Sequence, residues 1–163
     1  MRYSTFKRFN DNQAVHIDES WEEFAARLST FITTDDKTSV GLFSATFFGG
    51  TGRRLKSNAE AVSFLVLDFD NSKPLLDEAG DPIKDADDKI IKVRIDHPVG
   101  IMDVESTISA YDYVLVTSHS HAADWPRFRL VVPVESPVPA GSWTPYAEAM
   151  LAKLGLDEFL RAL

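Results

Sequence analysis

Two aspartates, Asp68 and Asp70, follow directly on the apolar run from Phe64 to Leu67. Residues two apart in a strand face the same side of the sheet, so both carboxylates are expected on one face. Two carboxylates placed in this way can share a hard divalent cation such as Mg²⁺ or Mn²⁺, which prefers oxygen ligands. The metal also relieves their mutual repulsion, which otherwise favours a proton on one of them. The sequence therefore predicts a metal site at Asp68 and Asp70.

Histidines and arginines form a second group, where one predicted strand ends and the next begins. Residues 117–121 read Thr-Ser-His-Ser-His, and residues 127–129 read Arg-Phe-Arg. If the five-residue loop between them pairs 121 with 127, then 119 pairs with 129, and the four basic side chains share one face. Both residue types donate to phosphate oxygens, and the arginine fork does so bidentately. We therefore predict a phosphate-binding group, with a solvated hairpin face as the alternative: His119, His121, Arg127 and Arg129, with Ser118 and Ser120 beside them.

A glycine-rich segment gives a weaker candidate for phosphate binding. Residues 49–52 read Gly-Gly-Thr-Gly, and basic residues follow at Arg53, Arg54 and Lys56. Backbone N–H groups and basic side chains in such a segment can cradle a phosphate. The segment lacks the Gly-Lys-Ser/Thr ending of a P-loop, so a flexible turn with solvated arginines is the alternative. We include Arg53 and Lys56 among the candidate nucleotide-binding residues.

Composition narrows the class of protein. The chain has 163 residues, 44% of them apolar and 26% charged, which is typical of a soluble globular protein of one domain. The absence of cysteine excludes disulfides and thiolate metal sites and fits a cytoplasmic location. No apolar stretch approaches the roughly 20 residues of a membrane span, so we expect no membrane partner. We predict a single domain over residues 1–163.

The charge distribution limits the expected contacts with nucleic acid. The net charge of −8 argues against tight, sequence-independent binding to long duplex DNA. The acids are concentrated between Asp77 and Asp88, however, whereas basic residues gather near residues 2–8, 53–56 and 127–129. A local phosphate-binding surface is compatible with this arrangement.

The helices and strands indicated by the sequence pattern predict how these residues are positioned. Together they predict an α+β fold, with a mostly antiparallel sheet and flanking helices. Ser20 to Glu23 has the pattern of a capping box, which predicts a helix through Phe31. The continuous apolar body of 62–70 predicts a central strand that is covered on both faces. Residues 73–97 are expected to form an inserted, hairpin-like excursion. The remaining expected elements are strands at 40–48, 113–117 (extending to 121) and 127–134, and helices at 103–110 and 144–154.

The order of these motifs resembles the archaeo-eukaryotic primase superfamily, most closely the primase-polymerase domains of phage and plasmid replication proteins. Three stretches carry the resemblance, within residues 40–155. They are the apolar strand ending in Asp-x-Asp at 64–71, the strand ending in Ser and His at 113–121, and the strand opening Pro-Arg-Phe-Arg at 126–133.

The resemblance implies an RRM-like sheet and metal-dependent nucleotidyl transfer in DNA replication. The catalytic residues it implies are Asp68 and Asp70, which bind Mg²⁺ or Mn²⁺, and His121 (or His119), which contacts the phosphates of the incoming nucleotide. The partners it implies are nucleoside triphosphates, single-stranded or primed DNA, and a helicase domain or protein. Related proteins continue beyond the last predicted helix, so a truncated C-terminus is expected.

Three other functions stay open. The predicted strand at 127–134 carries no third carboxylate in its body, which favours a non-catalytic nucleotide- or nucleic-acid-binding module on the same fold. His119 and His121, together with Tyr146 as nucleophile, would fit a nicking endonuclease with a His-x-His metal site. The run from Asp68 to Ser72 resembles the nucleophile motif of HAD-type phosphatases, in which Asp68 would be phosphorylated.

Overall fold

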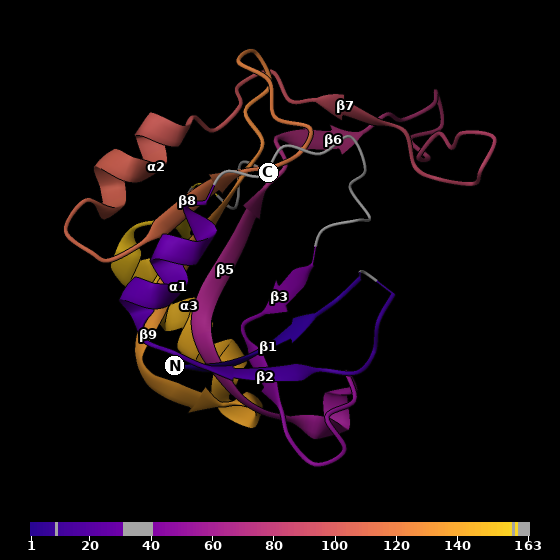
Figure 1. Cartoon of the computed structure of the whole chain (residues 1–163). Coiled ribbons are helices and arrows are strands. Elements are labelled where there is room, and N and C mark those ends of the chain that lie inside the picture. Colours follow the sequence, from indigo (N-terminus) through magenta and orange to yellow (C-terminus); the bar gives the residue numbers. More distant parts are fainter. Residues whose placement is uncertain (9, 31–40, 158, 160–163) are drawn as a thin grey trace.

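The computed structural model describes residues 1–8, 10–30, 41–157 and 159. At its centre, two long strands, β5 (Ala59–Phe69) and β9 (Phe128–Pro139), pair antiparallel (Figure 1). β4 (Thr46–Phe48) and β8 (Val114–Thr117) flank them, giving the order β4-β5-β9-β8. Every strand pair among the described residues is antiparallel. The predicted α+β class with mostly antiparallel sheets is confirmed, and the parallel β/α units of a HAD-type phosphatase are not found in this part of the chain.

A second sheet curls against the first and has the order β2-β1-β3, formed by β2 (Val15–Asp18), β1 (Arg2–Phe6) and β3 (Leu42–Ser44). The prediction of one strand over 40–48 is wrong within the described residues, because β3 and β4 belong to different sheets and are separated by Ala45. The carbonyl of Ala45 accepts from the Ser63 N–H at 3.0 Å, where the β5–β9 register shifts. Val40 lies outside the described residues.

The two faces of β5 are both covered, as its continuous apolar sequence predicts. Leu65, Leu67 and Phe69 face a core completed by α2 (Ile101–Ile108) and α3 (Trp143–Leu154). The alternate residue Phe64 faces a second core, formed with Tyr3 of β1 and Phe24 of α1 (Trp21–Leu28). Each large apolar side chain buried in this way contributes about 1.5–3 kcal/mol. This burial fixes β5 as the support for the polar residues at its end.

Local signals account for the helix boundaries. Ser20 and Glu23 form the predicted capping box of α1, each side chain bonding the backbone of the other. α3 ends at Gly155, which adopts a left-handed φ of 69° that suits glycine. The predicted helix at 103–110 starts two residues earlier, at Ile101. The two 3₁₀ turns are η1 (Lys56–Asn58) and η2 (Ala140–Ser142). Phe31, the last residue of the predicted first helix, lies outside the described residues.

The predicted excursion at 73–97 forms a hairpin of β6 (Ser72–Pro74) and β7 (Lys92–Arg94), with a long exposed tip between the strands. The hairpin lies beyond the end of β5, at the top of Figure 1. The N–H of Ile95 donates to the Asn71 carbonyl at 3.1 Å, which ties the base of the hairpin to the end of β5. The excursion is therefore anchored next to the two aspartates.

Candidate functional site

Asp68 and Arg129 form an ion pair at one end of the central strands. They are direct cross-strand partners in the β5–β9 register. Nε and an Nη atom of Arg129 donate to the two carboxylate oxygens at 2.8 and 2.7 Å. This is the bidentate geometry in which a planar guanidinium binds best. The Asp68 side chain remains 63% exposed, so solvent and ligands can reach it.

Asp70 lies deeper and has more partners. Its Oδ1 accepts from Nε and an Nη atom of Arg127, and its Oδ2 accepts from Lys92 Nζ at 2.9 Å and Ser72 Oγ at 2.8 Å. Burial alone would raise the pKa of Asp70, but the hydrogen bonds from Lys92, Arg127 and Ser72 and the charge of Arg127 outweigh it. The pKa is therefore held well below its usual range, and Asp70 is an anion at neutral pH.

The structure places both aspartates on the same side as both arginines. Arg127 directly precedes β9 and Arg129 lies in it, and each pairs with one aspartate at the end of β5: Arg129 with Asp68, and Arg127 with Asp70, which directly follows the strand. Two ion pairs thus lie on one side of the chain, separated by the Phe69–Phe128 pair, whose side chains face the other way. The sequence predicted the two aspartates and the two arginines as members of separate metal-binding and phosphate-binding groups, and it did not indicate that they pair directly.

Asn71 holds the segments around the site together. Its side chain is fully buried and donates to the carbonyls of Val99 and Pro126 at 2.9 and 2.6 Å, while its Oδ1 accepts from the Val99 N–H at 2.8 Å. The backbone φ of 48° is left-handed, which asparagine tolerates better than most residues. The indole N–H of Trp125 reaches the Asn71 carbonyl at 3.1 Å. Asn71 thereby fixes the end of β5 against two segments distant in sequence.

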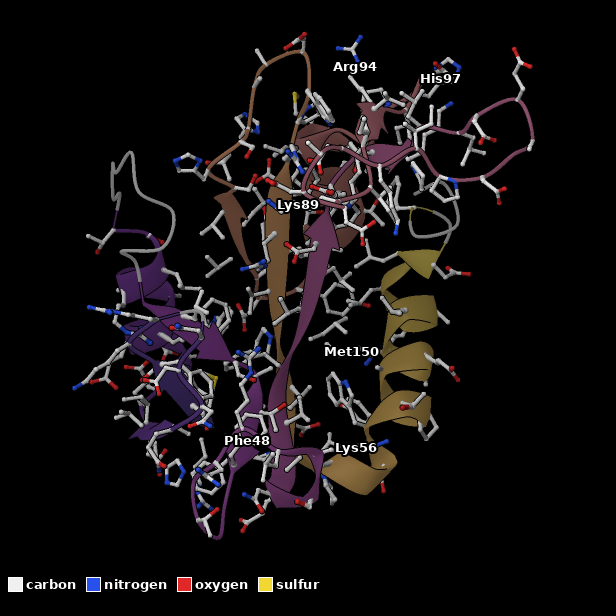
Figure 2. The ribbon with its side chains drawn as sticks, turned by 90° about the vertical axis from the view of Figure 1, so that its right-hand side faces the viewer. Phe48, Lys56, Lys89, Arg94, His97 and Met150 are labelled. Carbon is white, nitrogen blue, oxygen red and sulfur yellow. The ribbon has the colours of Figure 1, made fainter. Side chains whose placement is uncertain are left out.

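The excursion contributes residues that sequence analysis missed. Lys92 on β7 binds Asp70, and Arg94 binds both the backbone carbonyl and the carboxylate of Asp124. Asp124 belongs to the loop that carries His119 and His121, so the excursion connects that loop to the aspartates. Figure 2 shows Arg94 at the upper end of the molecule, on the same side as this loop. The alternating basic residues of β7 were visible in the sequence, but nothing there indicated their partners.

The predicted hairpin register is wrong by three residues. Thr117 pairs with Phe128 and Val116 with Arg129, whereas we expected 119 opposite 129 and 121 opposite 127. β8 ends at Thr117 instead of extending to 121, because the loop folds into a compact turn closed by the Ala122–Trp125 bridge. His119 and His121 therefore lie in an exposed loop with Ser118 and Ser120, and not on the sheet face.

His121 nevertheless lies next to Arg127. Its ring nitrogen Nδ1 accepts a hydrogen bond from the backbone N–H of Arg127 at 3.2 Å. The backbone N–H of His121 donates to the Ser118 carbonyl at 3.0 Å. With Nδ1 as the acceptor, the neutral ring carries its proton on Nε2, which makes Nε2 a hydrogen-bond donor. The ring is exposed. His121 is thus oriented by the same residue that holds Asp70.

A cavity of about 410 Å³ opens beside Asp68 and Arg129, between the two sheets. Arg54 lines it, with its guanidinium over the Phe6 ring at 5.1 Å. Arg53 and Lys56, the predicted candidates in this segment, do not line it. Lys56 lies near the start of β5, at the lower end of Figure 2, about 30 Å from Asp68 at the usual rise per strand residue. Of the three basic residues in this segment, Arg54 is the one that lines the cavity.

The donor set fits Mg²⁺ or Mn²⁺, the ions that the resemblance implies. Such ions are commonly held by one or two carboxylates, with water and substrate phosphates completing the shell. Asp68 and Asp70 supply two carboxylates on one side of β5, both partly accessible. No cluster of three or more acidic, histidine or cysteine side chains with metal-binding geometry occurs within the described residues. The site suits a metal that arrives with a phosphate ligand better than a metal enclosed by protein alone.

Tyr146, the nucleophile required by the nicking alternative, lines a different cavity. This cavity, of about 600 Å³, lies between α1 and α3 and also contains Glu135, but neither histidine. The Tyr146 ring stacks on Trp143, with ring centroids 6.0 Å apart. The structure therefore does not bring Tyr146 together with His119 and His121.

Comparisons with known proteins give no independent indication of function. A scan against protein-family models and searches of curated proteins and solved structures each found no match. In the part of the chain that the structure describes, no helix has the length and apolar character needed to cross a membrane.

Proposed function

We propose that this protein is a metal-dependent nucleotidyltransferase domain of the primase-polymerase type, built on an RRM-like sheet. The observation that carries the proposal is the group of two aspartates and two arginines where β5 ends and β9 begins, beside a cavity of about 410 Å³. Acids that can hold a divalent cation and arginines that can hold phosphate are the two requirements of a nucleoside triphosphate site. The cavity volume lies in the range of small-ligand sites.

Each residue has a role in this proposal. Asp68 and Asp70 hold Mg²⁺ or Mn²⁺, which when bound stabilises negative charge on the phosphoryl oxygens. Arg127 and Arg129 neutralise the triphosphate, and Nε2 of His121 donates to a phosphate oxygen. His119, Ser118 and Ser120 belong to the same exposed loop and contribute further donors to that ligand.

Basic residues at the end of β1 and in the segment before β5 supply a surface for single-stranded or primed DNA. These residues are exposed, and in the described part of the chain none of them forms an ion pair with a carboxylate. They are Lys7, Arg8, Arg53, Arg54 and Lys56. Unpaired cations are the usual contact for a nucleic-acid backbone. Arg54 also lines the cavity, so this surface leads towards the aspartates. A helicase domain or protein is the partner proposed for replication.

The test is incubation of the protein with Mn²⁺ or Mg²⁺, labelled nucleotides, and single-stranded or primed DNA. Extension is expected for the natural sequence and is expected to be lost in Asp68→Ala and Asp70→Ala. Glu78→Ala is the matched control, because Glu78 is an exposed acid in the tip of the excursion. Full activity in both aspartate variants would contradict the proposal.

A second candidate is a non-catalytic nucleotide- or nucleic-acid-binding module. It is favoured by the pairing of both aspartates with arginines and by the lack of a three-acid cluster within the described residues. In that case nucleotide or DNA binding persists without metal, no extension occurs, and Asp70→Ala leaves affinity nearly unchanged. Cleavage with a covalent tyrosyl adduct would instead support the nicking alternative.

A further inference from the structure

All four carboxylate oxygens of Asp68 and Asp70 already accept hydrogen bonds from cationic side chains. Arg129 occupies both oxygens of Asp68, Arg127 occupies Oδ1 of Asp70, and Lys92 occupies Oδ2. Three positive charges thus surround two negative ones. A divalent cation that approached these oxygens would meet like charges within a few ångströms. Metal alone is therefore expected to bind weakly, and ligand binding must rearrange these contacts.

Of the three cations, Lys92 loses the fewest hydrogen bonds when it leaves its aspartate. Its ammonium makes one hydrogen bond to Asp70, whereas each arginine contacts its aspartate through two nitrogen atoms. The side chain is 54% exposed, and it is a point charge on a flexible stem. Its backbone is fixed, because Lys92 pairs with Pro74 in the β6–β7 hairpin. The base of the side chain is anchored at the site while its tip is free to change partner.

We propose that Lys92 is a phosphate-binding residue that exchanges partners. It holds Asp70 in the ligand-free protein and moves to an oxygen of the bound polyphosphate, which leaves Oδ2 of Asp70 accessible to the metal. This inference rests on the proposed function and adds to it the coupling of metal and phosphate. A metal–triphosphate complex carries about two negative charges, so it can take up the displaced ammonium, which free metal cannot. The ligand class is a nucleoside triphosphate bound together with its metal.

The proposal predicts that Lys92→Ala changes the affinities for metal and for polyphosphate in opposite directions. Lys92→Ala removes the cation that competes for Asp70, so affinity for Mn²⁺ alone should rise. The same change removes a phosphate partner, so affinity for inorganic tripolyphosphate without metal should fall. Each change is expected to be about threefold to tenfold. General damage to the site would lower both affinities.

Isothermal titration of Mn²⁺ alone and of tripolyphosphate alone measures the two affinities. Lys89→Ala is the matched control, because Lys89 lies in the same excursion and pairs with Asp87 instead of Asp70; neither affinity should change in it. Lys92→Gln retains most of the stem without the charge and should repeat both shifts if Lys92→Ala fails to fold. Unchanged tripolyphosphate affinity, or a fall in both affinities in a folded variant, overturns the inference.

The failure of the inference is distinguishable from failure of the proposed function. If the natural sequence extends primers and Lys92→Ala behaves like Lys89→Ala in both titrations, only the role of Lys92 is wrong. If the natural sequence binds neither Mn²⁺ nor tripolyphosphate and extends no primer, the proposed function is wrong and the inference fails with it.

Discussion

The aspartates in the tip of the excursion and those at the end of β5 use their charges differently. In the tip, Asp77 accepts from the N–H groups of Ala79 and Asp81, and Asp85 accepts from those of Asp87 and Lys89. All of these partners lie within four residues. Asp68 and Asp70 are instead held by arginines 61 and 57 residues away.

This difference in the sequence separation of their partners indicates different roles for the two groups of aspartates. Local carboxylate-to-backbone bonds stabilise a turn, and a turn can form wherever the sequence places one. The carboxylates of Asp68 and Asp70 come together with their cations only when β5, β7 and β9 are folded. Aspartates that are charged, accessible and held by cations distant in sequence are candidates for ligand binding. The aspartates of the tip stabilise the local turns.

The largest expected effect is on nucleotidyl transfer, which should depend on the aspartates at the end of β5 and not on those in the tip of the excursion. Asp70→Asn removes the charge that holds metal, so nucleotidyl transfer should fall by at least about 100-fold. Asp85→Asn retains the oxygen that accepts in the turn, so activity should stay within about twofold of the natural sequence. Primer extension under single-turnover conditions measures both. An equal loss of primer extension in Asp70→Asn and Asp85→Asn would contradict the different roles of the two groups of aspartates.

The next effect concerns Asn71, which joins the end of β5 to the excursion. Asn71→Ala leaves the buried Val99 N–H and two carbonyls without their partner, so the free energy of unfolding should fall by about 3 kcal/mol. Urea denaturation measures this. Asn58 is the control, because its side-chain amide also donates two hydrogen bonds, to Thr51 and Arg53, but these bonds are exposed to solvent; Asn58→Ala should cost no more than about 1 kcal/mol. A similar loss in both variants would contradict the anchoring role.

A smaller effect follows from pH. The pKa of Asp70 in the folded protein lies below its unfolded value of 3.8. Its stabilising contribution is therefore present above that value and is lost as the pH falls below it towards the folded pKa. Asp70→Asn should be less stable than the natural sequence at pH 7, and this difference in stability should shrink steadily as the pH falls below about 4. Thermal denaturation across this range tests it, with Asp81→Asn as the control expected to follow the natural curve. A gap that stays constant with pH would exclude an ion-pair origin.

The smallest effect is expected in the tip. Lys84 and Asp88 form an exposed ion pair at 2.8 Å, with side chains 50% and 82% exposed. Solvent screens such pairs, so Lys84→Ala should change the free energy of unfolding by less than about 0.5 kcal/mol. Urea denaturation at low and high salt measures it. A loss above 1 kcal/mol would mean that charges in the tip contribute as much as those near the site.

Much of the site could be predicted from local pattern. The apolar run before Asp68 indicates a buried strand, and its alternation places Asp68 and Asp70 on one face. The spacing of Arg127 and Arg129 does the same for β9. These predictions succeeded because a strand repeats every two residues and burial on both faces fixes the register of β5 against β9.

The histidine loop could not be predicted in the same way. Its register depends on where β8 ends, and that is influenced by Trp125, whose indole N–H reaches the carbonyls of Asp70 and Asn71 across the sheet. This contact spans about fifty residues of sequence and leaves no periodic pattern. A shift of three residues in a strand also exchanges the two faces, so a small error in register moved both histidines off the predicted face.

The sequence by itself determined that Asp68 and Asp70 share one face of the chain and that Arg127 and Arg129 share one face, because strand periodicity is a local property. Only the tertiary structure decided that each aspartate pairs with an arginine, that Lys92 reaches Asp70 from the excursion, and that Arg54 rather than Arg53 or Lys56 lines the cavity. Those contacts depend on how sheets and hairpins fold onto one another. The physical reason is that a charge selects its partner by distance in space, which the spacing of residues along the chain does not specify.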